Sequence, residues 1–117
     1  MSNEQYPDVV MPTCPAEKIL KGQKALVTGA SSGIGKSVAI ELGKAGADVV
    51  VNYKGGADEA NEVAAEIGKY GSRVYAHQAD VSNEEQVKEM FQKMFEEFGT
   101  IDILINNAGL QQDAPFD

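Results

Sequence analysis

Short apolar runs alternate with amphipathic stretches along this chain of 117 residues. Runs of aliphatic and β-branched residues at 24–28, 48–53, 73–77 and 101–106 predict four strands. Apolar residues at helical spacing over 33–45 and 58–69 predict two helices. A capping signature at Ser82-Asn83-Glu84-Glu85 predicts the start of a third helix, which ends at Gly99. The expected inward stripes are Ile34, Val38, Leu42 and Ala45, then Ala60, Val63, Ala64 and Ile67, then Val87, Met90, Phe91, Met94 and Phe98.

The alternation of strand and helix predicts the α/β class. Right-handed crossovers then give a Rossmann-like, doubly wound parallel sheet with strand order 3-2-1-4. In that order the strand at 101–106 lies on an edge and exposes apolar residues such as Ile103 and Leu104. The sheet is therefore expected to be incomplete, and the chain to be the N-terminal part of a longer enzyme.

Composition and charge exclude several classes of function for this chain. The net charge is −8, from 18 acidic and 10 basic residues, which opposes a nucleic-acid-binding role. Cys14 is the single cysteine, so no intrachain disulfide and no metal site are predicted. No apolar run approaches the roughly 20 residues of a membrane span, and no signal peptide is recognisable. The predicted location is cytoplasmic, without a membrane partner.

Residues 24–35 carry the strongest candidate chemistry. The predicted strand ends at Thr28 and is followed by Gly29, Gly33 and Gly35 before a helix begins. Glycines let the backbone approach a ligand, and the free N–H groups of a first helical turn attract anions. Besides a plain tight turn, two phosphate-binding interpretations remain. One is a P-loop, because residues 30–37 read Ala-x-x-x-x-Gly-Lys-Ser, one residue short of that motif. The other is a dinucleotide fold.

Three motifs together favour the dinucleotide fold. Thr28-Gly29-Ala30-Ser31-Ser32-Gly33-Ile34-Gly35, Asp80-Val81 and Asn106-Asn107-Ala108-Gly109 resemble the TGxxxGxG, DV and NNAG motifs of the short-chain dehydrogenase/reductase family, in the family's order. Residues 49–54 and 105–110 resemble the glucose 1-dehydrogenase-like members. The resemblance implies the N-terminal part of a dinucleotide-binding Rossmann domain over 23–117, whereas residues 1–22, which hold Pro7, Pro12 and Pro15 and show no periodicity, predict an irregular arm.

The resemblance also implies roles for individual residues. It places Gly29, Ser31, Ser32 and Ile34 along the ribose and pyrophosphate of the cofactor, with Gly33 and Gly35 keeping the backbone close. It assigns the Thr28 hydroxyl to support of the turn after the fourth strand. Asp80 would accept from the adenine amino group, with Val81 against the ring, although Asp80 also suits a turn before Ser82. The floor under the nicotinamide ribose would be formed by Asn107, Ala108 and Gly109.

The expected cofactor is NADP, with NAD as the second candidate. An NAD-preferring site carries a carboxylate about 20 residues past the loop. Tyr53 and Lys54 stand there instead, so a 2′-phosphate meets no acid and Lys54 can pair with it. The competing interpretation of Lys54 is an ordinary exposed lysine.

No catalytic residue can be assigned. Members of the family use a Ser and a Tyr-x-x-x-Lys pair beyond the fourth strand, and none of the four tyrosines here has a lysine four residues later. We therefore expect an NAD(P)-dependent oxidoreductase that acts on an alcohol or carbonyl, such as a sugar, and is a homo-oligomer at full length. This chain by itself is expected to be inactive, and the alternative is a stand-alone, non-catalytic NAD(P)-binding module.

Overall fold

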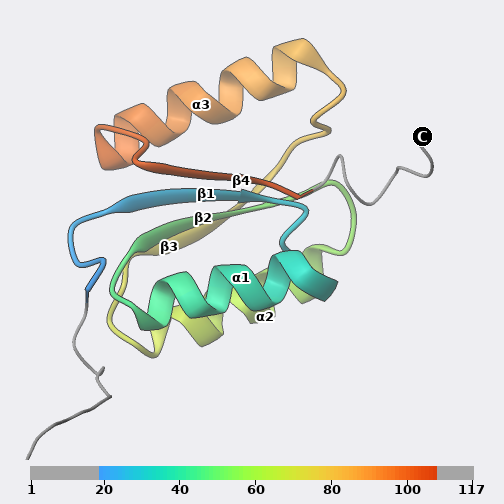
Figure 1. Ribbon diagram of the computed structural model, residues 1–117. Helices are drawn as coiled ribbons and strands as arrows, with labels where there is room; N and C mark the ends of the chain where they lie inside the picture. Colours follow the sequence, from blue (N-terminus) through green and yellow to red (C-terminus); the bar gives the residue numbers. More distant parts are fainter. Residues whose placement is uncertain (1–18, 108–117) are drawn as a thin grey trace, which may run out of the picture.

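A parallel sheet with helices on both faces forms the body of the protein in a computed structural model that describes residues 19–107 (Figure 1). The elements follow one another as β1 (Lys24–Thr28), α1 (Gly33–Lys44), β2 (Asp48–Tyr53), α2 (Ala57–Gly68), β3 (Val74–Gln78), α3 (Glu84–Phe98) and β4 (Ile103–Asn106). All strand pairs are parallel and the order in the sheet is β3-β2-β1-β4. The predicted fold class and strand order are confirmed.

The core has two halves, one on each face of the sheet. Helices α1 and α2 cover one face, and α3 covers the other (Figure 1). Successive residues of the buried strands β1 and β2 point alternately into the two halves. Val27 and Val49 pack with α1 and α2. Leu26 and Val50 pack with Met90 of α3. A strand that must fill both faces reads as a continuous apolar run, which is the pattern at 49–51.

Helix α1 approaches the sheet through small residues. Gly35, Ala39 and Gly43 are its buried positions, whereas Ile34, which was predicted to point inward, is 74% exposed. A Cβ on Gly43 would stand 2.6 Å from Ile67 Cγ2 of α2, so only glycine permits this spacing between the two helices. The predicted apolar stripe was wrong at Ile34 because the close contact uses the smallest side chains.

The N-cap of helix α3 lies one residue later than predicted. Asn83, not Ser82, is the N-cap, and its side chain accepts a hydrogen bond from Gln86 N at 3.1 Å. The Ser82 amide and hydroxyl both donate to Asp80 Oδ1, at 2.9 and 2.6 Å, so Ser82 is not available to cap the helix. Gly99 ends α3 in the left-handed conformation, at φ 84°.

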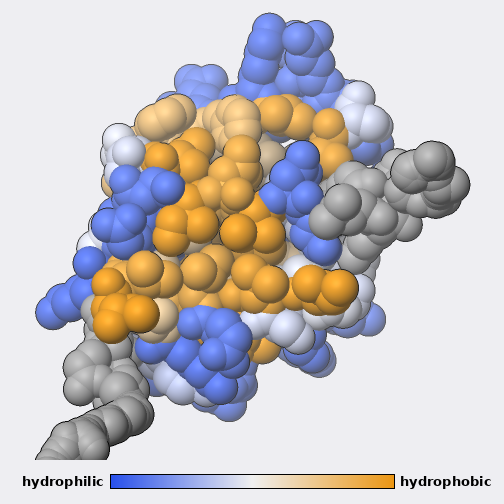
Figure 2. Space-filling view, in the orientation of Figure 1, coloured by the Kyte–Doolittle hydropathy of each residue, from blue (hydrophilic) through white to orange (hydrophobic). Residues whose placement is uncertain are grey.

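The β4 side of the sheet exposes apolar surface. Within residues 19–107, β4 pairs with β1 alone, begins at Ile103 rather than Ile101, and leaves Leu104 52% exposed. Asp102 precedes the ladder because its carboxylate and N–H both bind the backbone of Lys24. Figure 2 shows apolar side chains gathered on the face of the molecule that presents β4 and the adjoining surfaces of α1 and α3. Exposed Ile34 and Phe95 belong to the large apolar residues at the surface.

The segment that leads into β1 contacts the body of the protein. Residues 19–22, the last four of the predicted arm, form turns, and Leu20 N donates to Ala45 O at 2.7 Å. Leu20 packs against the α1–α2 half of the core. Within residues 19–107, no helix is both long and apolar enough to cross a membrane.

Candidate cofactor site

The peptide of Gly29, directly after β1, is held from both neighbouring strands. Its N–H donates to Asn52 Oδ1 of β2 at 3.3 Å, and its carbonyl accepts from Asn107 Nδ2, just beyond β4, at 3.1 Å. Ala30 N donates to the Asn52 carbonyl at 2.8 Å. Gly29 has φ 62°, a conformation that favours glycine. The start of the loop is therefore fixed by hydrogen bonds to two buried asparagine side chains, at the carboxyl ends of three adjacent strands.

Gly35 closes the loop against its own beginning. A Cβ at this buried position would overlap the carbonyl of Gly29 and stand 2.7 Å from Asn107 Nδ2. The first turn of α1 thus rests on the peptide that the two asparagines hold. This contact explains in physical terms why the third glycine of the motif carries no side chain.

The N-terminus of α1 is suited to an anion. Ser32 is the N-cap but makes no side-chain capping hydrogen bond, and the first turn holds no acidic residue. Gly33, at φ 61°, has open space where a Cβ would stand. The N–H groups of this turn are therefore accessible and uncompensated, which fits a pyrophosphate group. Exposed Ile34 lies in the same turn.

The carboxyl end of β4 is tied to the end of β1 by a hydroxyl. Thr28 Oγ1 donates to Asn106 Oδ1 at 3.2 Å and to the Ile105 carbonyl at 3.4 Å. These bonds join the ends of β1 and β4, and the predicted support of the turn near Ala108 stays a prediction because that turn lies outside the described residues. Asn107 is 4% exposed and lies beneath the loop, whereas the predicted site residues Ala108 and Gly109 lie outside the described residues.

Tyr53, Lys54 and Asp80 come together at the ends of β2 and β3. Lys54 Nζ is 3.4 Å from Asp80 Oδ2, and Lys54 itself is highly exposed. Two hydrogen bonds from Ser82, and then the Lys54 charge, hold the pKa of Asp80 below its ordinary value. Tyr53 and Val81 are half-buried. Asp80 thus occupies the turn role that the sequence left open, and its second oxygen faces Lys54.

Asn52 is a site residue that the sequence analysis did not single out. It is 1% exposed, and its Nδ2 donates to the carbonyls of His77 and Ala79 at 3.3 and 3.2 Å, in addition to its contacts with the glycine loop. One buried side chain therefore ties the loop after β1 to the end of β3. The sequence does contain a signal for Asn52, because its amide side chain directly follows three valines in a strand predicted to be buried. A buried amide needs hydrogen-bond partners.

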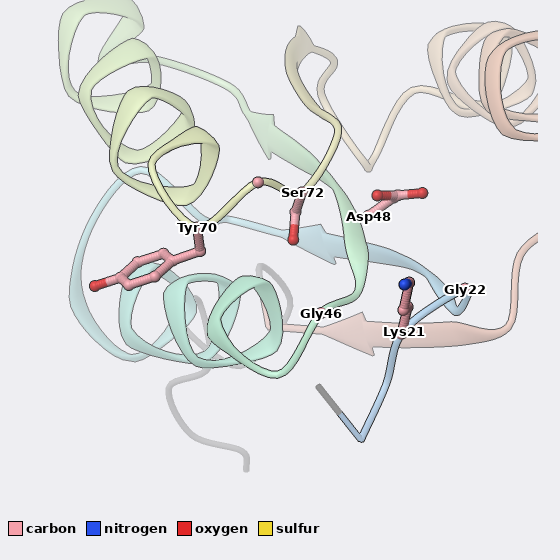
Figure 3. Close-up of a pocket in the computed structure, with 7 residues that line it drawn as sticks. Lys21, Gly22, Gly46, Asp48, Tyr70 and Ser72 are labelled. Carbon is pink, nitrogen blue, oxygen red and sulfur yellow. The ribbon is translucent and has the colours of Figure 1, made fainter. Parts of the chain in front are cut away.

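The other end of the sheet holds a cavity of about 460 Å³ (Figure 3). Its walls include Lys21, Asp48, Tyr70 and Ser72, which lie near the amino ends of the strands or just after α2. It contains none of the predicted site residues, and ligands of open α/β sheets bind at the carboxyl ends of the strands. No group of three or more potential metal-ligating side chains lies in the described part of the chain.

Known proteins provide an independent comparison. The family model for short chain dehydrogenases matches residues 23–117. The chain belongs to the short-chain dehydrogenase/reductase family. Proteins of this family bind NAD or NADP, so the family match favours the dinucleotide interpretation of the loop at 28–35 over the P-loop interpretation.

Individual relatives agree with the family. Over 98 residues the chain is 47% identical to the hydroxynaphthalene reductase-like protein Arp2 of Metarhizium guizhouense, covering 84% of this chain and 37% of that protein. It is 46% identical over 91 residues to the 3-oxoacyl-(acyl-carrier-protein) reductase FabG of Staphylococcus epidermidis, covering 78% and 37%. The crystal structure of a hydroxysteroid dehydrogenase from Escherichia coli superposes with a TM-score of 0.74 at 38% identity, covering 88% of this chain and 44% of that one.

These relatives limit what the comparison shows about the function of this chain. The chain spans little more than a third of the length of the two curated relatives. Their names refer to different substrates, and none of the three is called a glucose 1-dehydrogenase. The family is therefore shown, whereas the resemblance to the glucose 1-dehydrogenase-like group stays a prediction.

Proposed function

We propose that this chain is the cofactor-binding part of an NAD(P)-dependent oxidoreductase. The observation that carries the proposal is the doubly held Gly29 peptide, with Gly35 packed on it and an uncapped, acid-free first turn of α1 beside it. A rigid loop of this kind presents N–H groups to a pyrophosphate without reorganisation.

The proposed reaction is hydride transfer between the nicotinamide and an alcohol or carbonyl. The bound cofactor would supply the hydride chemistry. The part of the chain described here would supply binding: the α1 N-terminus takes the pyrophosphate, Lys54 and Ser31 face the adenosine ribose, and Asn107 supports the loop beneath. No residue of the 117 is assigned to proton transfer, so we expect the chain alone to bind cofactor without turnover.

The substrate is proposed only as a small molecule with an alcohol or carbonyl group. A sugar such as glucose remains the candidate that residues 49–54 and 105–110 suggest by resemblance. The full-length enzyme is proposed to be a cytoplasmic homo-oligomer. The competing proposal is a binding module without catalysis. An enzyme assay of the full-length gene product, with NADPH oxidation followed against a panel of ketones and sugars, separates the two.

We also propose that NADP binds at least as well as NAD. Neither Tyr53 nor Lys54 is acidic, and the 73% exposed Lys54 side chain can turn from Asp80 to a 2′-phosphate. Lys54→Ala should weaken NADP about fivefold, the scale of an exposed ion pair, and leave NAD unchanged. Tyr53→Asp should shift the affinity ratio about tenfold toward NAD, because it places a carboxylate beside the ribose.

Dissociation constants for both nucleotides, measured by titration calorimetry, test these variants. Lys69→Ala is the matched control, because Lys69 is 72% exposed and lies just past the other end of α2. Unchanged NADP affinity in Lys54→Ala would show that Lys54 does not contact the 2′-phosphate. If the wild-type chain binds neither nucleotide, the proposed function itself is wrong.

A further inference from the structure

The loops after β1 and β2 meet at the place where the adenosine ribose would lie. In a Rossmann sheet the pyrophosphate sits at the first helix N-terminus, and the ribose hydroxyls face the end of the second strand. Here a Cβ built on Gly56, the N-cap of α2, would stand 3.6 Å from Ser31 Oγ of the glycine loop. The first turn of α2 and Ser31 are therefore neighbours, although 25 positions separate Ser31 from Gly56 in the sequence.

A carboxylate reaches the same place. Glu59 Oε1 would stand 3.1 Å from that same Cβ on Gly56, so the Glu59 side chain turns back over the start of α2. Gly55 and Gly56 have no side chains to fill this space, and Gly56 has φ 79°. Within residues 19–107 the Glu59 carboxylate has no hydrogen bond or ion pair, so it keeps acceptor capacity for a ligand.

The charges around this position oppose one another. Lys54 brings one positive charge, which it shares with Asp80 at 3.4 Å. Glu59 adds a second negative charge on the α2 side, so the three side chains together carry one net negative charge. The spacing rule that looks for an acid at the end of β2 cannot detect it, because Glu59 comes from the first turn of the next helix.

We propose that Glu59 is a specificity-determining residue for the cofactor, which rests on the function proposed above. Its carboxylate accepts hydrogen bonds from the ribose hydroxyls of NAD and repels the 2′-phosphate of NADP. Lys54 acts in the opposite direction. The two side chains together make this a site that accepts both nucleotides, with their ratio set by the balance between one cation and one anion.

The test is the variant Glu59→Gln in the full 117-residue chain. Glutamine keeps the size and one acceptor oxygen and removes the charge. NADP should bind about fivefold tighter and NAD about twofold weaker, a shift in the ratio of about tenfold, as expected for a charge within a few ångströms of a phosphate near a protein surface. The 2′,5′-ADP and 5′-ADP fragments should show the same shift, because the discrimination lies at the ribose.

Asp58→Asn is the matched control. Asp58 lies in the same first turn of α2, is exposed and carries the same charge. A shift confined to Glu59→Gln supports the proposal. Equal shifts in both variants would mean that only the general field of the turn matters, and an unchanged ratio in Glu59→Gln would mean that the carboxylate does not face the ribose; either result overturns it. Failure of the wild-type chain to bind either nucleotide is a different result, which removes the proposed function itself.

Discussion

The loops after β1 and β2 end neighbouring strands of one sheet, yet the structure holds them in opposite ways. The β1–α1 loop is fixed by hydrogen bonds between Gly29 and the buried side chains of Asn52 and Asn107, and by the contact of Gly35 with Gly29. The β2–α2 loop is exposed, and Gln78, which donates to the Lys54 carbonyl at 3.1 Å, is its main support from β3.

The difference separates two tasks. The pyrophosphate is common to NAD and NADP, so the loop that receives it can be rigid and built into the core. The ribose substituent differs between the two cofactors, and it faces a loop whose charged side chains can change at little cost to the fold. Substitutions in the first loop should therefore affect folding and all binding, whereas those in the second should change the choice of cofactor.

Gly35→Ala should have the largest effect. The new methyl group overlaps the Gly29 carbonyl, which is backbone and cannot move aside as the end of a flexible side chain could, and it stands 2.7 Å from the buried Asn107 Nδ2. We expect the free energy of unfolding, measured by urea denaturation, to fall by about 3 kcal/mol. The affinities for both cofactors, measured by calorimetry, should be lost. Gly68→Ala is the control, because its Cβ would make an ordinary contact with Val74 at 3.9 Å. Wild-type binding by Gly35→Ala would contradict the rigid-loop interpretation.

Asn52→Leu should come next. The side chain has a similar size, but Gly29 N–H and the carbonyls of His77 and Ala79 lose their partner. Leaving buried polar groups unpaired should lower the unfolding free energy by about 2 to 3 kcal/mol and weaken NAD and NADP equally. Asn61→Leu, at an exposed position of α2, should have little effect on either quantity. A selective loss of one cofactor would show that Asn52 acts on the ribose rather than on the loop.

Gly56→Ala sharpens the comparison from the other side. At φ 79° a side chain costs about 1 kcal/mol of stability, and the only tight contact, 3.1 Å to Glu59 Oε1, is with the end of a flexible side chain. We expect both cofactors to bind within about threefold of wild type while their ratio changes, because Glu59 must move. Gly55→Ala, with nothing near its Cβ, should change neither. Complete loss of binding in Gly56→Ala would mean that the second loop is as constrained as the first.

Asp48→Asn should leave both loops unaffected. Asp48 starts β2 at the far end of the sheet; burial alone would raise its pKa, but hydrogen bonds from the Lys24 side chain and the Arg73 amide, with both positive charges, hold the pKa below its ordinary value. A depressed folded-state pKa gives stability that is present above the unfolded pKa, near 4, and lost as the pH falls through the folded value. The variant should be about 1 kcal/mol less stable at pH 7, and the difference should shrink progressively as the pH falls below about 4 toward the lowered folded-state pKa. Unfolding curves at both pH values, with cofactor affinity at pH 7, check it.

The elements were predictable because local patterns report burial directly. Continuous apolar runs predicted β1 and β2, which lie between two helical layers, and helical spacing predicted α2 and α3. Ile34 was misplaced because periodicity counts large apolar residues, whereas α1 approaches the sheet through Gly35, Ala39 and Gly43. Asn83 replaced Ser82 as cap because Asp80, two residues earlier, takes both Ser82 donors.

The sequence by itself determined the fold class, the strand order and the family, because each follows from patterns or motifs whose residues lie close together in the chain. Tertiary structure alone decided that Asn52 and Asn107 bind the two backbone polar groups of Gly29, that Lys54 pairs with Asp80, and that Glu59 Oε1 and Ser31 Oγ both lie beside Gly56. The physical reason is that these contacts join residues from different βα units. Their distances depend on how the strands pair and how closely α1 and α2 pack, and no local spacing records that.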